Sequence, residues 1–330
     1  MAKYSNDMWR DFPKTAIEFD ERFQTEEDCR AYWIEARWGG KPACANCQSA
    51  RVWAERGGRL FECAECGHQT SLTSGTVLEK TKYPLKVWFR AVFEIASRKN
   101  GISAKELQRI MGFGSYKTAW SWLHKIRASL MRPDAEHMSQ NVEIDEAYVG
   151  SKRLGKALVL VAAERGGRVR LALAENNDEA TIKRFADAYI APRADVTTDG
   201  LASYNGRSLG KRDHEQKVQT REERREDDAL QTAHWVVSLF KRWLLGTHGG
   251  AVKTRHLQSY LDEFQFRYNR RKTNGAARLT ARAIEQLVAK PARTMKKIIK
   301  EPQTYRACLS ASIRLNRGHL RMLGIGGCLE

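Results

Sequence analysis

Four cysteines in the first quarter of the chain constrain its folding more than any other feature. Cys44 and Cys47 form one C-x2-C pair, and Cys63 and Cys66 form a second pair after fifteen intervening residues. Two residues between the cysteines of a pair allow a tight turn that directs both thiolates at one tetrahedral ion, at about 2.3 Å each. The spacing therefore predicts a zinc ribbon, which we place at residues 41–76.

The stretch between the two pairs supports this interpretation. Residues 52–55 and 60–62 are strand-like and flank Arg56-Gly57-Gly58-Arg59, in which the two glycines favour a hairpin turn. Such a hairpin would return the second pair of cysteines to the first. Four sulfur ligands leave no open coordination position, so we expect this Zn²⁺ to be structural and not catalytic.

Disulfide bonds and a redox C-x2-C motif are the alternatives for these cysteines. The chain has seven cysteines, an odd number, and the other three match no ligand spacing: Cys29, Cys308 and Cys328. A redox motif would not occur as a spaced pair. The first residues, MAKYSNDMWRDF, lack the apolar core of a signal peptide. This predicts an intracellular protein, and disulfide bonds are rare in such proteins.

Apolar runs in the chain are short. The longest, residues 157–163, has seven residues, whereas a membrane span requires roughly 18 or more. We therefore expect a cytoplasmic protein without membrane association. The composition, 42% hydrophobic and 29% charged residues, argues against wholesale disorder.

The positive charge is concentrated in one segment. The whole chain carries a formal net charge of +18, yet residues 1–79 have 10 basic and 13 acidic side chains, and residues 80–132 have 12 basic and 2 acidic ones. Concentrated basic charge in a folded, aromatic-containing segment indicates a polyanion partner, most often nucleic acid. We therefore expect nucleic acid as partner; if this is double-stranded DNA, association with the nucleoid follows. A solvated basic face is the alternative.

The same segment has a helical pattern. Apolar residues recur at helical spacing from Pro84 to Ile95, and Ser103 with Glu106 predicts the cap of a second helix. Gly112-Phe113-Gly114 then turns the chain into a third helix. We interpret residues 77–135 as a helix-turn-helix region whose recognition surface contains Tyr116, Lys117, Ser121, His124, Lys125 and Arg127. A small helical bundle that joins two domains is the alternative.

After residue 140 the pattern becomes that of strands. Residues 142–149, 157–163 and 168–174 predict three consecutive strands, Asp178 predicts a helix cap, and residues 195–198 predict a strand that ends at Asp199. This order of elements is that of a ribonuclease H-like core. There the first and fourth strands lie side by side, so Asp145 and Asp199 would face one another.

Paired carboxylates at this place have a chemical purpose. They can hold two Mg²⁺ ions roughly 3.5–4 Å apart, for the attacking and the leaving oxygen of phosphoryl transfer. The alternative is that Asp145 and Asp199 are ordinary residues at strand ends. We expect Glu143 and Glu146 to point away from Asp145 and to be weaker candidates.

A third ligand is expected on a helix beside this edge. The helix predicted around residues 233–245 carries His234 and Lys241, seven residues apart and hence on one face. Mg²⁺ prefers oxygen ligands, so His234 would bind Mn²⁺ better or carry a proton. A core or capping histidine is the alternative.

These motifs together resemble a known family. The stretches CANC…CAEC, SLTSGTVLEKTKYPLKVWFRA, ISAKELQRIMG, KTAWSWLHKIR, VEIDEAYVG, TTDGLASYNG, KRWLLGTHGG and HLQSYLDEFQFRYNRR follow one another between about residues 25 and 290. They are similar to the zinc-ribbon transposases of bacterial insertion sequences, whose catalytic domain is related to the Merlin elements. The resemblance implies a DDE-type transposase that has a ribonuclease H-like fold, binds terminal inverted repeats and uses Mg²⁺ or Mn²⁺.

The resemblance also assigns roles to residues. Asp145 and Asp199 match the first two catalytic aspartates. Lys241 matches the lysine that follows the third catalytic position, for which the resemblance implies a contact with DNA phosphate. Many members have Glu where this chain has His234. Members with His there have an Asn shortly before the lysine, at the place of Leu239. A carboxylate from the nearby charge run could replace the missing ligand: Glu226, Asp227 or Asp228.

The expected architecture is a multi-domain α+β chain. It comprises an N-terminal helical segment (1–40), the zinc ribbon (41–76), the helix-turn-helix region (77–135), a ribonuclease H-like catalytic domain with a mixed sheet and flanking helices (136–290), and a basic extension (291–330). Arg270 and Arg271 follow a helix predicted over residues 256–268 and are expected to meet DNA. We expect at least a homodimer on DNA.

Two functions fit this sequence. The first is a transposase that cleaves DNA at the ends of its element and joins them to a target. The second is a DNA-binding protein, a decayed copy or a repressor, that keeps the fold without strand transfer, and the missing third carboxylate favours it. A nuclease that does not transpose is a weaker third hypothesis, because the end-recognition modules are also present.

Overall fold

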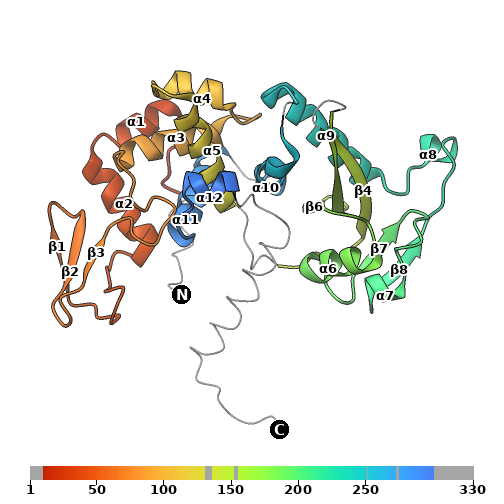
Figure 1. Cartoon of the computed structure of the whole chain (residues 1–330), viewed down its shortest axis with the longest axis horizontal. Coiled ribbons are helices and arrows are strands. Elements are labelled where there is room, and N and C mark those ends of the chain that lie inside the picture. The colour runs from red at the N-terminus through yellow and green to blue at the C-terminus, as the bar shows by residue number, and fades with distance from the viewer. Residues whose placement is uncertain (1–9, 131–135, 152–154, 251, 273–274, 301–330) are drawn as a thin grey trace, which may run out of the picture. The chain divides into compact units, whose positions relative to one another are not determined.

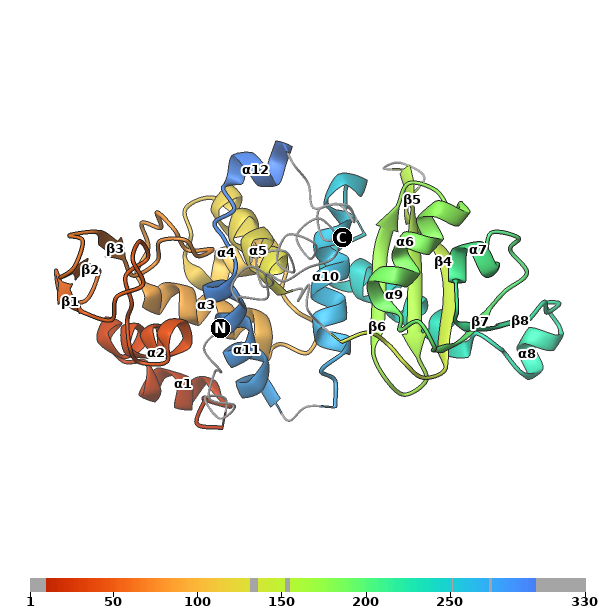
Figure 2. The same ribbon diagram turned by 90° about the horizontal axis from the view of Figure 1, so that it is seen from below.

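The computed structural model describes residues 10–130, 136–151, 155–250, 252–272 and 275–300 (Figures 1 and 2). Its contacts form two compact units. The first contains residues 10–130 together with the segment from Lys272 to Lys300, and the second contains the described residues between 136 and 271.

The four-cysteine region of the first unit is a three-stranded antiparallel sheet. Strands β1 (Val52–Glu55), β2 (Leu60–Cys63) and β3 (Gln69–Ser71) lie in that order. Glu55 pairs with Leu60, so residues 56–59 form the predicted hairpin turn. Arg56, Gly57 and Gly58 all have positive φ there, which the two glycines adopt without strain.

Helices make up the rest of the first unit. They are α1 (Ala16–Arg22), α2 (Glu26–Trp38), α3 (Leu85–Ser97), α4 (Ala104–Met111), α5 (Tyr116–Leu130), α11 (Gly275–Ala289) and α12 (Met295–Lys300). The ring of Trp88 on α3 stacks on that of Trp122 on α5, with 3.4 Å between centroids. Both side chains are buried, as expected for core residues.

Helices α4 and α5 follow the predicted boundaries. The Ser103 hydroxyl accepts a hydrogen bond of 3.1 Å from the Glu106 N–H and caps α4. Gly112 ends this helix with a φ of 62°, a left-handed conformation that favours glycine. The chain then re-enters a helix at Tyr116.

Helix α11 lies in a different unit from the one predicted. We assigned residues 136–290 to one domain, but α11 packs on α2, α3 and α5 of the first unit. Its apolar face explains the packing, because Ala277, Ala281, Ile284 and Leu287 are all buried. The Leu287 carbonyl also accepts a hydrogen bond from the Val77 N–H.

The second unit is built on a five-stranded mixed sheet. Its strands are β4 (Val142–Ser151), β5 (Gly155–Glu164), β6 (Val169–Ala174), β7 (Asp195–Thr198) and β8 (Asp213–Gln216), in the order β6-β5-β4-β7-β8. β4, β5 and β6 pair antiparallel, whereas β7 runs parallel to β4 and β8 parallel to β7. The predicted strands are confirmed, and β8 is additional.

Helices cover the two faces of this sheet. On one face, α6 (Glu179–Tyr189) buries Ile182 and Phe185 against β4, β5 and β6. On the other face lie α9 (Gln231–His248) and α10 (Leu257–Tyr268), with Phe240 and Leu261 in the core (Figure 2). Short elements complete the unit: α7 (Gly206–Leu209), α8 (Glu223–Glu226) and η1 (Thr254–His256).

Helix α10 also closes the edge of strand β6. Gln265 accepts a hydrogen bond of 3.0 Å from the Leu171 N–H and donates one of 2.9 Å to the Leu171 carbonyl. Asn269 makes the same pair with Val169, at 2.7 and 3.0 Å. Gln258 accepts from the Leu173 N–H. Side-chain amides thus take the place of a sixth strand, and they protect an edge that could otherwise pair with another chain.

Within the described ranges, no helix combines the length and the apolar character that a membrane crossing needs.

Candidate functional site

The two aspartates predicted to act together lie at neighbouring strand positions. Ile144 of β4 pairs with Thr198 of β7 in parallel register. Asp145 and Asp199 follow these two residues directly, and both side chains line one small pocket of about 40 Å³. The Asp199 carboxylate is oriented by the Leu201 N–H, which donates to its Oδ1 at 3.0 Å.

His234 completes this group from the first turn of α9. Its Nε2 lies 3.5 Å from Oδ2 of Asp145, and its Nδ1 lies 2.6 Å from Oδ2 of Asp228. The side chain of Asp228 is 20% exposed and that of His234 is 32% exposed, so both remain accessible from the pocket. The complete lining is Asp145, Asp199, Lys217, Gln219, Arg224, Asp228, Leu230 and His234.

Of the three possible replacement carboxylates, only Asp228 lines the pocket. Glu226 and Asp227 are exposed and do not contribute to its wall. Of the acidic side chains in the charge run 221–228, only that of Asp228, the last residue, therefore lies beside His234.

Our expectation for Glu143 was wrong. Side chains alternate along a strand, so residues two apart share a face, and Glu143 lies on the same face of β4 as Asp145. Its buried carboxylate accepts hydrogen bonds from the Ala233 N–H at 2.8 Å, from the Thr232 hydroxyl at 3.0 Å and from Arg165 Nε at 3.1 Å. Glu143 thereby caps the N-terminus of α9, which begins just before His234.

Glu146 does point to the opposite face, as expected. Its Oε2 accepts a hydrogen bond of 2.7 Å from the Tyr204 hydroxyl. Burial raises the pKa of Glu146 above its usual value, and the Tyr204 bond opposes this shift.

Burial also dominates the electrostatics of Asp145. Its side chain is 13% exposed, and loss of solvent raises its pKa from 3.8 to about 6. The neighbouring His234 lowers the pKa, whereas the negative charges of Glu146 and Asp199 raise it. A carboxylate that is costly to ionise in this way gains from a cation beside it.

The pocket residues fit a divalent cation by their chemistry. Asp145 and Asp199 offer the hard oxygen ligands that Mg²⁺ requires, and His234 adds a nitrogen that suits Mn²⁺ better. Among the described residues, the four cysteines are the only group of three or more His, Cys, Asp or Glu whose ligand atoms all lie within 4.8 Å of one another. The pocket residues form close pairs with His234 but no such group, which a pair of ions shared between separate ligands allows.

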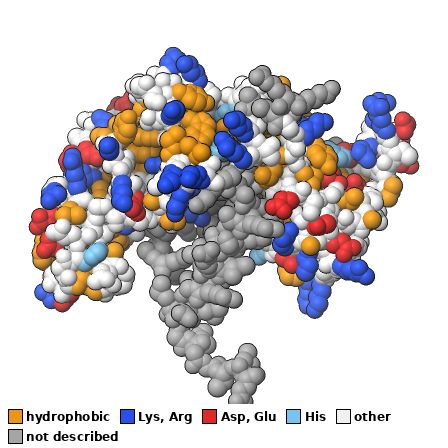
Figure 3. Space-filling view, viewed as in Figure 1, with side chains coloured by type: hydrophobic (Ala, Val, Ile, Leu, Met, Phe, Trp, Pro, Cys, Tyr) orange, Lys and Arg blue, Asp and Glu red, His pale blue; other side chains and the backbone are white. Residues whose placement is uncertain are grey.

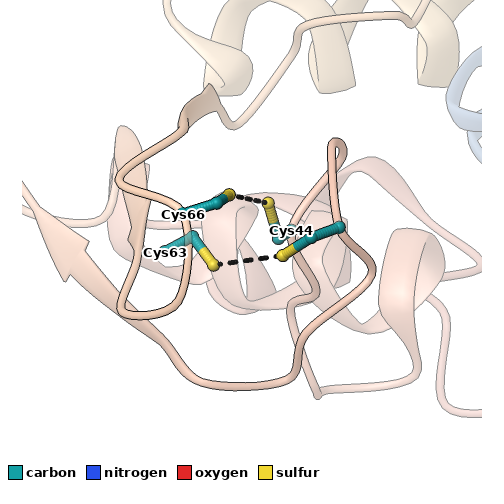
Figure 4. Close-up of side chains that lie close together, drawn as sticks. Cys44, Cys63 and Cys66 are labelled. Carbon is teal, nitrogen blue, oxygen red and sulfur yellow. Dashed lines mark hydrogen bonds between the residues drawn. The ribbon is translucent and has the colours of Figure 1, made fainter.

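The four cysteines fit one zinc ion. Sulfurs of Cys44 and Cys66 lie 3.6 Å apart (Figure 4). Those of Cys47 and Cys63 lie 3.5 Å apart. Four Zn–S bonds of about 2.3 Å in a tetrahedron would separate the sulfurs by about 3.8 Å. The two turns are alike, because the Asn46 and Glu65 N–H groups each donate to the first sulfur of their pair at 3.4 Å.

One of these thiols is already acidic without metal. The backbone N–H groups of Cys47 and Asn46 and the thiols of Cys66 and Cys47 stabilise the Cys44 thiolate. Their effect exceeds that of burial and lowers the pKa of Cys44 from 9.0 to about 6. A thiolate is the form that binds zinc. The Ser49 N–H lowers the pKa of Cys47, but the neighbouring thiols and burial raise it to about 12. The fit to a structural zinc ion therefore rests on the arrangement of the four sulfurs.

The residues predicted to contact DNA from α5 differ in their exposure. Tyr116 and Lys117 are exposed at the start of the helix. Ser121, His124 and Arg127 are buried, because α4, α11 and α12 pack around α5. Lys125 is half-buried, and burial lowers its pKa. Only the start of α5 is therefore available as a surface.

The other predicted DNA contacts lie in the second unit. Lys241 is exposed two turns after His234, outside the pocket lining. Arg271 donates to the carbonyls of Gly167 and Tyr268 at 2.9 and 3.0 Å, and Arg270 lies over the Phe266 ring at 4.1 Å. Both arginines therefore stabilise the end of α10.

Sequence reasoning missed two cations at the pocket. Lys217 follows strand β8 directly, and Arg224 lies on α8. The sequence analysis did not predict β8, which runs parallel to β7 so that the carboxyl ends of the two strands meet and Lys217 lies at the pocket. Arg224 lies in the charge run between residues 221 and 228, which has no periodic pattern.

Two family profiles match the chain. Residues 137–269 match the "ISXO2-like transposase domain", and residues 24–69 match the "Transposase zinc-ribbon domain". The chain belongs to the zinc-ribbon transposases of insertion sequences. The first match contains every residue of the pocket, and the second contains all four cysteines of the metal cluster.

Two individual proteins are also similar to this transposase. An "Uncharacterized protein in transposable element ISH50" from Halobacterium salinarum is 26% identical over 280 residues, which cover 74% of this chain and 91% of that protein. A chain in the structure of the simian T-cell lymphotropic virus intasome with the PP2A regulatory subunit B56 gamma is 10% identical. It covers 54% of this chain and 64% of its own length, and its TM-score of 0.28 is too low to establish a common fold.

Proposed function

We propose that this transposase binds the terminal inverted repeats of its insertion sequence and catalyses metal-dependent cleavage and strand transfer of double-stranded DNA. The observation that carries the proposal is the parallel pairing of Ile144 with Thr198, which brings Asp145 and Asp199 into one pocket. His234 lies beside them, 3.5 Å from Asp145.

The order of strands supports a ribonuclease H-like catalytic domain. Three antiparallel strands are followed by a helix and by two parallel strands, so that the first and fourth strands are neighbours. The fourth residue of β4 and the residue that follows β7 then supply the two aspartates. This is the arrangement that the sequence motifs imply for the family.

The reaction consists of two in-line displacements at phosphorus. Water attacks at the end of the element and releases a 3′-hydroxyl, and this hydroxyl then attacks a target phosphate and releases the 3′-oxygen of the target strand. Two divalent cations would supply the positive charge for the attacking and leaving oxygens. Asp145, Asp199 and His234 would hold these cations, and Lys217 and Arg224 would attract the DNA phosphate to the same wall of the pocket.

The first unit supports end recognition. Helices α4 and α5 are joined by the short segment 112–115, and Tyr116 and Lys117 are exposed at the start of α5. We propose that this pair is a helix-turn-helix and that the zinc ribbon assists it. Two ends must be joined together, so we also propose at least a homodimer on DNA.

The test is cleavage and joining of a duplex that carries the element ends, in Mg²⁺ and in Mn²⁺. Wild type is compared with Asp145→Ala, Asp199→Ala and His234→Ala. Asp195→Ala is a matched control, because Asp195 is an exposed aspartate on the same strand as Thr198. We expect cleavage in wild type and in the control, and none in the two pocket aspartate variants.

The contrary result has a definite meaning. Specific binding of the ends by wild type without cleavage in either cation would favour the second candidate, a DNA-binding protein that keeps the fold. The histidine in place of a third carboxylate is the observation in its favour. Cleavage without joining would instead indicate a nuclease.

A further inference from the structure

The two ring nitrogens of His234 face different carboxylates. Nδ1 lies 2.6 Å from Asp228, within hydrogen-bond distance, whereas Nε2 lies 3.5 Å from Asp145. An ionised carboxylate has no proton to donate, so the short contact with Asp228 requires a hydrogen on Nδ1. In the neutral ring, Nε2 then carries the lone pair and faces Asp145.

Asp228 is itself held in place before α9 begins. Its Oδ1 accepts a hydrogen bond of 3.1 Å from the Leu230 N–H, and its carbonyl accepts one of 3.1 Å from the Gln231 N–H. Gln219 fixes the same segment, because it donates to the Asp227 carbonyl at 2.6 Å and accepts from the Ala229 N–H at 3.0 Å. One oxygen of Asp228 is thus bound to the backbone, and the other is directed at the ring.

We propose that Asp228 is a positioning residue that holds His234 in the Nδ1–H form, so that Nε2 is presented to a cation beside Asp145. Histidines that bind metals generally donate their second ring N–H to a carboxylate, a carbonyl or a water, which fixes the tautomer and makes the ligand more basic. Asp228 therefore acts through His234 and does not replace the missing third carboxylate as a ligand. This inference rests on the proposed function of the pocket.

A second carboxylate has a separate task. Glu143 bonds the Ala233 N–H and the Thr232 hydroxyl, and so it fixes where the helix starts. Asp228 fixes how the ring is turned. The two effects can be separated by substitution, because the backbone bonds of Glu143 do not involve Asp228.

The first test needs no cation and no DNA. The full-length protein is labelled with ¹⁵N-histidine, and long-range ¹H–¹⁵N spectra show which ring nitrogen of His234 carries the hydrogen. The chain has eight histidines, so the His234 signals are assigned by their loss in His234→Gln. We expect Nδ1–H in wild type and in the control Asp227→Asn, whose side chain is exposed, and a shift toward Nε2–H in Asp228→Ala.

The second test is binding of Mn²⁺, measured by electron paramagnetic resonance. Loss of a carboxylate that orients a ligand weakens metal binding by about 10–100-fold. We expect a loss of that size in Asp228→Ala, a smaller one in Asp228→Asn, whose amide oxygen still accepts from Nδ1–H, and a larger one in Asp145→Ala. If Asp228→Ala does not fold, the comparison of Asp228→Asn with wild type and with Asp145→Ala still tests the positioning role.

The outcomes separate this inference from the proposed function. Nε2–H in wild type, or an unchanged tautomer in both Asp228 variants, would overturn the positioning role. Loss of Mn²⁺ binding in Asp228→Asn as large as in Asp145→Ala would show that Asp228 is a ligand. If wild type fails to cleave DNA but the tautomer and Mn²⁺ results are as expected, the proposed reaction fails and the positioning role stands.

Discussion

The carboxylate of Glu143 accepts a hydrogen bond of 2.8 Å from the Ala233 N–H, so the strand that carries Asp145 also holds the first turn of the helix that carries His234. A buried donor that loses its acceptor costs about 1–3 kcal/mol. We therefore expect Glu143→Ala to lower the free energy of unfolding by about 2–4 kcal/mol, because two donors in α9 lose their acceptor.

Urea denaturation of the apo protein measures this change. The matched variant is Glu143→Gln, whose carbonyl can still accept from the Ala233 N–H, and we expect it to lose less stability than Glu143→Ala. Equal stability of wild type and Glu143→Ala would show that this cap does not hold the helix. The outcome also matters for the pocket, because a displaced first turn moves His234 away from Asp145.

The raised pKa of Asp145, about 6, predicts a pH dependence. Protonated Asp145 is neutral and cannot hold a cation. We expect cleavage at subsaturating Mn²⁺ to decrease as the pH falls through about 6. A cation competes with the proton, so the midpoint of this decrease should move to lower pH as the Mn²⁺ concentration rises. A midpoint that is independent of Mn²⁺ would exclude Asp145 as the titrating ligand.

The raised pKa of Asp145 also predicts how the stability of the cation-free protein depends on pH: stability should fall, and not rise, with increasing pH. The pKa of Asp145 in the folded chain lies above its unfolded value of 3.8, so the folded chain binds more protons between about pH 4 and 6. Its free energy of unfolding should therefore decrease as the pH rises through this window. Asp145→Asn should remove this part of the pH dependence, as measured by urea denaturation at several pH values.

Much of the second unit could be predicted because its signals are local. Alternation of apolar and polar residues predicts the strands, and the capping residue Asp178 predicts the start of α6. The parallel pairing of β4 with β7 follows from the expected order of elements. The proximity of Asp145 and Asp199 depends only on that order. The roles of both residues remain predictions.

The rest depends on contacts that no local pattern encodes. Lys217 and Asp228 reach the pocket through irregular chain between β8 and α9. His124 and Arg127 have the residue types of a DNA-binding face, but α11, about 150 residues later in the chain, packs against α5. Glu143 is a different case, because strand alternation alone places it on the face of Asp145.

Removal of zinc should affect only the first unit. A closed four-sulfur site contributes directly to folding, and the cluster of Cys44, Cys47, Cys63 and Cys66 holds the two ends of the ribbon together. We expect one zinc per chain in wild type and loss of both the metal and end binding in Cys47→Ser. Metal analysis measures the zinc content, and gel-shift assays measure binding of the element ends. The control is Cys29→Ala, because Cys29 is a buried cysteine outside the cluster. Retention of zinc in Cys47→Ser would contradict the four-cysteine site.

The exposed start of α5 and its buried part should respond differently to substitution. Loss of one phosphate contact reduces the slope of log binding constant against log salt by about 1. We expect this for Lys117→Ala, with unchanged stability, in filter-binding titrations at several salt concentrations. Arg127→Ala should instead destabilise the fold, because its side chain is buried. An unchanged salt slope in Lys117→Ala would remove this lysine from the DNA interface.

The amide bonds between α10 and strand β6 predict a cost in both stability and solubility. Gln265 is buried and satisfies both backbone groups of Leu171. Its removal leaves the buried Leu171 N–H without a partner, at about 1–3 kcal/mol, and leaves the Leu171 carbonyl with only the 3.4 Å hydrogen bond from Gln258 Nε2. We expect Gln265→Ala to lower the free energy of unfolding by about 1–4 kcal/mol and to promote aggregation through the freed edge. The control is Gln231→Ala, at an exposed glutamine on α9, and light scattering with urea denaturation measures both effects. A Gln265→Ala protein as stable and as monodisperse as this control would show that the amides do not protect the edge.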